Sequence, residues 1–163
     1  MAFAAPSLKG RALRLLSQRE HSRAELMRKL AAYEEEPGSL ARALDELEAR
    51  GFISEARVVQ SVLHQRAARL GSARIRQELQ AKGIDAQAVA QAVQSLQDTE
   101  LARAQAVWQR RFGQPPADAK AHARQMRFLL TRGFSAEVVA RVLRAARTQV
   151  RAAGRAPATD SDD

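Results

Sequence analysis

The chain has 163 residues, of which 45% are hydrophobic but only 4% aromatic, and it contains no cysteine. This composition predicts an all-α protein, and it excludes disulfide bonds and zinc–thiolate sites. Lys and Arg outnumber Asp and Glu by 27 to 18, so the net charge of +9 favours a nucleic acid or an acidic protein as partner.

Apolar residues at helical spacing predict nine helices in three groups of three. The first group is expected at Leu8–Gln18, after Ser22 and at Leu40–Arg50; the second at Ser54–Leu70, after Ser72 and after Asp85; the third at Thr99–Phe112, Ala119–Thr131 and Ala136–Val150.

Short polar residues and glycines predict where these helices begin and end. Ser22 and Glu25 have the spacing of a capping box. The other expected N-caps are Ser39, Ser72, Asp85, Thr99 and Ser135, and the expected helix ends are Gly51, Gly71, Gly83 and Gly133.

The helix pair in Ser72–Leu96 returns about fifty residues later and about fifty residues earlier, which indicates an internal repeat. Lys82-Gly83-Ile84 corresponds to Arg132-Gly133-Phe134, and Leu79 corresponds to Leu129. We therefore predict three tandem three-helix repeats at 1–53, 54–98 and 99–150, followed by a disordered tail at 151–163.

No pattern of residues indicates catalysis, a metal site or a cofactor. The three histidines, His21, His64 and His122, fall in different repeats and are expected at the surface or at helix caps. Glu34–Glu36 are interpreted as a solvated helix end. Trp108 follows an apolar stripe and is expected in the core. The chain is therefore predicted not to be an enzyme.

The positive charge is concentrated in the second and third repeats. Residues 1–53 contain 9 basic and 8 acidic side chains, whereas residues 54–150 contain 16 and 7. Basic residues beside the apolar stripes are the candidates for contact with nucleic acid or an acidic protein. They are Arg66, Arg69, Arg74, Arg76, Lys82, Arg110, Arg111, Arg124, Arg127 and Arg132, with Arg141 and Arg144 in the same position on the last helix.

Two other functions are compatible with these patterns. Ser22–Gly51 reads as cap, helix, turn and helix, which is typical of a helix-turn-helix or winged-helix transcription factor. That segment is the least basic part of the chain, however, and lacks an alternating β-wing. The other alternative is a helical scaffold whose basic face binds an acidic protein tail without DNA.

Four segments resemble the signature segments of the RecX family, bacterial regulators of the RecA recombinase. They are R-x-x-S-R-A-E-L-x-x-K-L at Arg19–Leu30, G-F-I-S-E at Gly51–Glu55, G-S-A-R-I-R-Q-E-L-Q-A-K-G-I at Gly71–Ile84 and R-F-L-L-T-R-G-F-S at Arg127–Ser135. Where the family usually has two acidic residues and then aromatic residues, this chain has Ser54-Glu55, Val58 and Val62.

The resemblance implies an elongated, curved array of three three-helix repeats that binds in the groove of the RecA filament on single-stranded DNA. Such a protein restrains filament growth, ATP hydrolysis and strand exchange. The expected partners are RecA, its nucleoprotein filament and, without sequence specificity, single- or double-stranded DNA. No cofactor, metal or membrane is expected, and the protein is predicted to be a cytoplasmic monomer.

Overall fold

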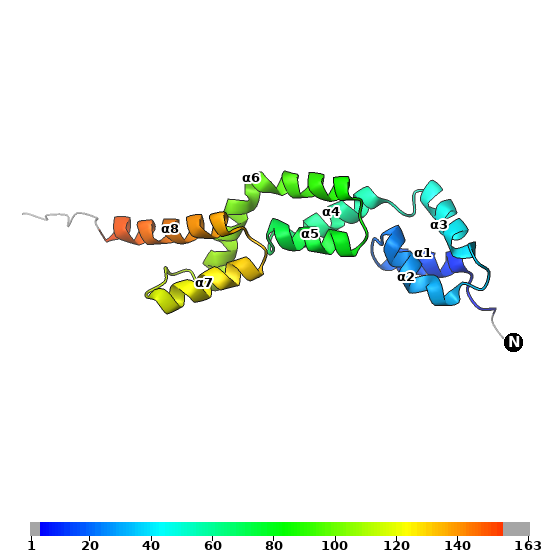
Figure 1. Ribbon diagram of the computed structural model, residues 1–163, viewed down its shortest axis with the longest axis horizontal. Helices are drawn as coiled ribbons and strands as arrows, with labels where there is room; N and C mark the ends of the chain where they lie inside the picture. The colour runs from blue at the N-terminus through cyan, green and yellow to red at the C-terminus, as the bar shows by residue number, and fades with distance from the viewer. Residues whose placement is uncertain (1–3, 155–163) are drawn as a thin grey trace, which may run out of the picture. The chain divides into compact units, whose positions relative to one another are not determined.

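The computed structural model describes residues 4–154, which form eight α-helices, one 3-10 helix and no strand. The predicted all-α class is therefore confirmed (Figure 1). The helices are α1 Leu8–Gln18, α2 Arg23–Leu30, α3 Ser39–Ala49, α4 Glu55–Arg66, α5 Ser72–Ala81, α6 Ala86–Arg111, α7 Ala119–Thr131 and α8 Ala136–Ala153, with the 3-10 helix η1 at Ala31–Tyr33.

The described residues divide into two compact units that do not coincide with the three predicted repeats. Unit 1 contains residues 4–66 and 76–94, and unit 2 contains residues 67–75 and 95–154. Helices α5 and α6 therefore each contribute one end to unit 1 and the other end to unit 2. Within the described residues, no helix is both long and apolar enough to cross a membrane.

Helices α1, α2 and α3 of unit 1 pack around one hydrophobic core (Figure 1). Their inward faces are built from aliphatic residues spaced three or four apart, as the sequence predicts. The buried members are Ala12, Leu26, Leu30, Leu40, Leu44, Leu47 and Ile53.

Local capping explains most helix ends in unit 1, with one correction. The capping box is present as predicted, because Ser22 Oγ accepts from the Glu25 N–H and the Glu25 carboxylate accepts from the Ser22 N–H. Ser39 does not cap α3. It is the first helical residue, Gly38 precedes it at φ +85°, and the Glu34 carboxylate accepts the Leu40 N–H instead (3.1 Å).

Helix α4 begins after Ser54, whose Oγ accepts from the Arg57 N–H (3.2 Å). Val58 and Val62 are buried, so the valines that replace the usual aromatics still point into the core. The helix ends at Arg66 instead of continuing to Leu70 as predicted. The carbonyl groups of Ala67, Ala68 and Leu70 instead accept hydrogen bonds from arginines of α6, as described below.

Helix α6 runs without interruption for 26 residues, where the sequence predicts two helices separated near Thr99. Asp85 caps its start as predicted, because its carboxylate accepts from the Gln87 N–H (3.0 Å). Thr99 caps nothing; its hydroxyl donates to the Leu96 carbonyl inside the helix (3.2 Å). Neither Gly nor Pro occurs between Ala86 and Arg111, so nothing breaks the helical backbone there.

Unit 2 has its own core, formed by the C-terminal part of α6 with α7 and α8, which lie side by side (Figure 1). Trp108 is only 6% exposed and donates from Nε1 to Gln125 Oε1 (2.8 Å), so its predicted core position is confirmed. Ser135 caps α8 as predicted. Helix α8 continues to Ala153, so the predicted tail cannot begin at 151, and residues 155–163 lie outside the described residues.

The histidines differ in their surroundings. His64 is exposed and His122 is half-buried. His21 is 1% exposed, so it does not lie at the surface, the first of its two predicted positions; it directly precedes Ser22, the N-cap of α2. Its ring is held between the Arg19 carbonyl oxygen (3.0 Å) and the Lys29 ammonium (3.4 Å).

Candidate functional site

Two glycines bring the start of α5 and the end of α7 into direct backbone contact within unit 2. The Gly71 N–H donates to the Arg132 carbonyl (2.8 Å), and the Ala73 N–H donates to the Gly133 carbonyl (3.2 Å). A Cβ atom on Gly71 would lie 2.3 Å from the carbonyl carbon and oxygen of Gly133. This glycine crossing therefore has no space for a side chain, and it fixes Arg74 beside Arg132.

Gly133 is constrained as tightly as Gly71. Its φ of +90° is a conformation that residues with a side chain rarely adopt. A Cβ atom there would also lie 2.5 Å from Cγ of Arg74. Gly133 thus both ends α7, as the sequence predicts, and permits the crossing, which the sequence does not reveal.

Helix α6 anchors the segment that leads into the crossing. The half-buried guanidinium of Arg103 donates to the carbonyls of Ala67 (2.8 Å) and Leu70 (2.7 Å), and Arg110 donates to the Ala68 carbonyl (3.0 Å). Burial lowers the pKa of Arg103 from its usual value. These bonds satisfy three carbonyl groups that would accept helical hydrogen bonds if α4 were longer. They also hold the segment that contains Arg69.

The first residue of α5 is fixed in a similar way. The Ser72 N–H and Oγ both donate to the Glu100 carboxylate on α6, at 3.2 and 2.9 Å. Ser72 is therefore a donor to a buried carboxylate and not the predicted N-cap of α5. Glu100 is one of only four acidic residues among the described residues of unit 2.

The fixed segments surround two adjoining hollows on the surface of unit 2. The larger has a volume of about 480 Å³ and the smaller about 350 Å³. Phe128 and Arg132 line both, so we treat them as one feature, the arginine groove. Its seven arginines are Arg69, Arg74, Arg110, Arg111, Arg124, Arg127 and Arg132, and its other lining residues are Leu70, Val107, Phe128 and Thr131.

Stacking on phenylalanine positions two of these guanidinium groups. The Arg132 guanidinium carbon lies 4.7 Å from the centre of the Phe128 ring, and that of Arg111 lies 5.8 Å away. Phe112 meets Phe128 edge to face, with 5.2 Å between ring centres. Cation–π contacts of this kind hold an arginine in place and leave its N–H donors free for an anion.

The arginine groove has no internal neutralising charge. Among residues 4–154, none of its seven arginines forms an ion pair with a carboxylate. Arginine is always protonated at physiological pH and its planar fork suits phosphate and carboxylate. The groove can therefore bind an anion, and the described residues offer it none.

Seven of the ten predicted contact residues thus gather in the arginine groove. The other three belong to unit 1. Arg76 is exposed on α5. Arg66 pairs with Glu78 (3.2 Å), and Lys82 pairs with Glu25 (3.1 Å), so each already has a carboxylate partner.

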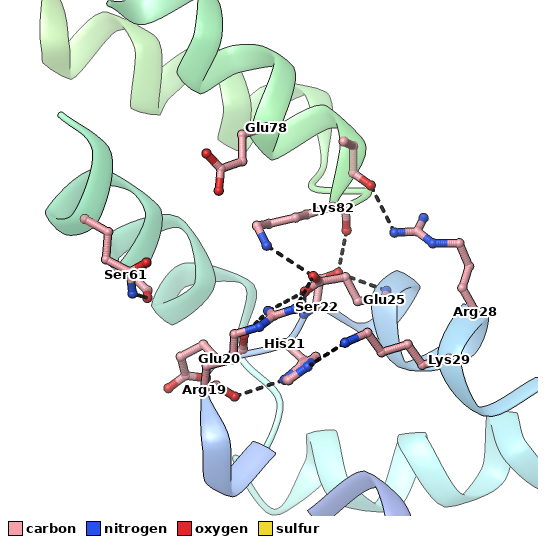
Figure 2. A network of polar contacts seen from close by, with 12 residues as sticks. Arg19, Glu20, His21, Ser22, Glu25, Arg28, Lys29, Ser61, Glu78 and Lys82 are labelled. Atoms are coloured by element: carbon pink, nitrogen blue, oxygen red, sulfur yellow. Dashed lines mark hydrogen bonds and ion pairs between the residues drawn. The ribbon is translucent and has the colours of Figure 1, made fainter. Parts of the chain in front are cut away.

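Figure 2 shows the polar contacts around Glu25, which join segments of unit 1 to one another. Its carboxylate also contacts Arg19 (3.0 Å), while Ser22 Oγ donates to the Lys82 carbonyl and Arg28 donates to the Ala81 carbonyl (3.0 Å). This Glu25 network joins the start of α2 to the end of α5 inside unit 1.

The pKa values within this network reflect its burial. Burial opposes ionisation of Glu25, but hydrogen bonds from Arg19, the Ser22 N–H and Lys82 outweigh it and lower the pKa to about 2. Burial, followed by the charges of Arg19 and Lys29, lowers the pKa of the His21 imidazole. Glu25 is thus ionised, and its carboxylate is held by partners from the segment before α2 and from the end of α5.

Fold and site together define a class: an all-helical protein of tandem three-helix domains with an arginine-lined groove. Comparison with known proteins makes this more specific. The first, second and third three-helix domains of RecX match residues 9–47, 54–93 and 98–143. The chain belongs to the RecX family of regulatory proteins.

Relatives and solved structures agree with this assignment. The regulatory protein RecX of Leptothrix cholodnii is 60% identical over 86% of this chain and 89% of its own length, and that of Ralstonia nicotianae is 49% identical over 86% and 88%. The crystal structure of RecX from Lactobacillus salivarius matches with a TM-score of 0.73 at 19% identity, over 86% of this chain and 95% of that one. The last comparison supports the fold alone.

Proposed function

We propose that this chain binds the RecA filament assembled on single-stranded DNA and inhibits its ATPase activity, its extension and its strand exchange, without catalysing a reaction itself. Membership of the RecX family supports a regulatory role. The observation that carries the proposal is the arginine groove, because seven guanidinium groups without a carboxylate partner in the described residues favour an anionic partner.

In this proposal the groove faces the filament and Arg76 adds to the contact. Bound across neighbouring protomers, the chain blocks the subunit addition or rearrangement that continued activity requires. We further propose that it acts in the cytoplasm as a monomer, without a cofactor. The winged-helix alternative has no comparable support, because its segment, Ser22–Gly51, contains five basic and seven acidic side chains and so has no excess of positive charge.

The test is DNA-dependent ATP hydrolysis by RecA of the same organism, titrated with this protein on DNA already saturated by filament. Loss of activity well below one molecule per RecA supports capping of filament ends, and loss near saturation supports coating of the groove. Hydrolysis that does not change at any ratio refutes the proposal.

A charge-reversal variant connects the activity to the surface. Replacing Arg74, Arg76, Arg124 and Arg127 by Glu is expected to abolish inhibition while helical content, measured by circular dichroism, stays the same. The matched control replaces four exposed arginines outside the groove by Glu: Arg14, Arg42, Arg147 and Arg151. Retained inhibition in the first variant, once folded, contradicts the choice of surface.

A further inference from the structure

The arginine groove lacks the apolar anchors that a protein partner would need. Protein interfaces obtain most of their affinity from aromatic or aliphatic side chains inserted into desolvated pockets. Here the two largest apolar lining residues, Leu70 and Phe128, are half-buried. The Phe128 ring is already in contact with Phe112 and Arg132. The groove therefore presents guanidinium groups to a ligand, together with the aliphatic stems of the arginine side chains and without a free apolar anchor.

The groove also lacks a stacking surface for bases. Sequence-tolerant binding of single strands usually uses exposed aromatic rings as platforms. Unit 2 contains four aromatic residues in its described part. Trp108 and Phe134 are buried, at 6% and 2% exposure, while Phe112 and Phe128 are half-buried and packed edge to face.

The helical spacing of the arginines suits a repeating anion better than a single one. Arg124 and Arg127 lie about one turn apart on the exposed face of α7, and Thr131 continues the same stripe. Arg74 from α5 and Arg110 and Arg111 from α6 approach the same hollows from other helices. A chain with one negative charge per residue and no bulky apolar group, such as a sugar–phosphate backbone, fits this distribution.

We infer that the arginine groove binds the phosphodiester backbone of a nucleic-acid strand and recognises its phosphates alone, without base stacking or base identity. This inference rests on the proposed function only in assigning the strand to a RecA filament. Binding of the strand by the groove is a property of this chain by itself, and it can be measured without RecA.

The decisive experiment compares oligothymidylate with an abasic strand of the same length, using fluorescence anisotropy and the full chain without RecA. Loss of a single stacked base would weaken binding by about fivefold or more. We expect the two affinities to agree within that factor. A larger loss for the abasic strand overturns the inference, and so does polyglutamate that displaces the strand at lower charge concentration than the abasic strand does.

A matched pair of variants places the site. Arg124→Gln with Arg127→Gln removes two groove charges, whereas Arg147→Gln with Arg151→Gln removes two exposed charges on α8 outside the groove. Each lost phosphate contact lowers the slope of log affinity against log salt by about 0.7, so the first variant should lose about 1.4 and the second close to none. Equal losses in both variants mean diffuse attraction and overturn the groove as the site.

The outcomes separate the two proposals. Inhibition of RecA without binding of the strand refutes the phosphate site and leaves the regulatory proposal standing. Binding of the strand without inhibition refutes the regulatory proposal and leaves the phosphate site standing. Circular dichroism of both variants confirms that their helices are intact, and all four substituted arginines are exposed and make no side-chain hydrogen bond within residues 4–154.

Discussion

The two compact units contain the same number of basic residues and use them differently. The described residues of unit 1 include 13 basic and 11 acidic side chains, and those of unit 2 include 13 and 4. All seven ion pairs found among residues 4–154 join residues of unit 1. Unit 1 thus pairs many of its charges internally, whereas no basic side chain in the described part of unit 2 forms an ion pair.

The comparison shows that a count of basic residues does not locate a binding surface. Lys82 and Arg127 both lie beside an apolar stripe in the sequence and carry the same charge. Lys82 is held by the buried Glu25 carboxylate (3.1 Å), whereas Arg127 has no carboxylate partner in the described part of the chain. The two residues differ because Lys82 has an acidic partner, Glu25, which is close in space but distant in the sequence.

The largest loss of stability is expected at the glycine crossing of unit 2. Gly71→Ala places a Cβ atom 2.3 Å from the Gly133 backbone, so the crossing must open, at a cost of about 4 kcal/mol. Urea unfolding followed by Trp108 fluorescence measures this, because Trp108 is the sole tryptophan and belongs to unit 2.

Gly113→Ala is a control in the same unit for a glycine with space for a side chain. Unlike Gly71, Gly113 has a positive φ, +64°, and its added Cβ would approach only Gln109, at 3.3 Å. We expect about 1 kcal/mol from the backbone conformation. A cost for Gly71→Ala no larger than that for Gly113→Ala would contradict the large effect expected from the close approach at the crossing.

A somewhat smaller loss of stability is expected when the buried Glu25 carboxylate of unit 1 is protonated. The Glu25 pKa is about 2 in the folded protein against an ordinary value of 4.5. Because the folded value is the lower one, the ionised carboxylate stabilises the fold fully above pH 4.5. That stabilisation, about 3 kcal/mol, is lost as the pH falls from 4.5 towards 2.

Urea unfolding at a series of pH values, followed by circular dichroism, measures this loss. Glu25→Gln cannot ionise, so the variant should be less stable at neutral pH and should show a correspondingly weaker pH dependence between 4.5 and 2. The same slope in both proteins would mean that other carboxylates cause the acid sensitivity.

An intermediate effect is expected at the anchor of the groove. Arg103→Gln leaves the Ala67 and Leu70 carbonyls without their donor, which should cost about 2 kcal/mol and weaken binding of a nucleic-acid strand. Arg103→Lys keeps the charge but lacks the planar guanidinium group, so this variant should be more stable than Arg103→Gln but less stable than the original protein. Full recovery by lysine would mean that the charge matters and the paired hydrogen bonds do not.

The smallest effect is expected for an exposed pair in unit 1. Arg66→Gln removes the ion pair with Glu78, and because the Arg66 side chain is 47% exposed the cost should stay below about 0.5 kcal/mol. RecA inhibition should also remain, since Arg66 lies outside the arginine groove. Loss of inhibition in this variant, with Arg127→Gln as the positive comparison, would extend the partner surface into unit 1.

Local sequence patterns predicted much of the fold because caps and apolar spacing act over a few residues. Ser22 with Glu25, Asp85 and Ser135 cap helices as expected. Thr99 misled the prediction, since threonine suits both an N-cap and a hydroxyl bond to a carbonyl one turn earlier.

The errors at the candidate site arise from contacts between residues far apart in the sequence. Ser72 has the local pattern of a cap, but Glu100 claims its hydroxyl (2.9 Å). Arg103 donates to a carbonyl just beyond the end of α4, and Glu25 forms an ion pair with Lys82. Charge counting identified the arginines as a set, and only the tertiary structure separates those that are paired from those that are free.

The glycine crossing also sets the time at which the groove appears during synthesis. Gly71 and Gly133 are separated by about sixty residues, so the loop between them closes only when the later glycine has left the ribosome. Until then Arg69 and Arg74 have no α7 beside them, and the emerging chain has no assembled anion site. The nascent protein thus completes α1 to α6 before its arginine groove is assembled.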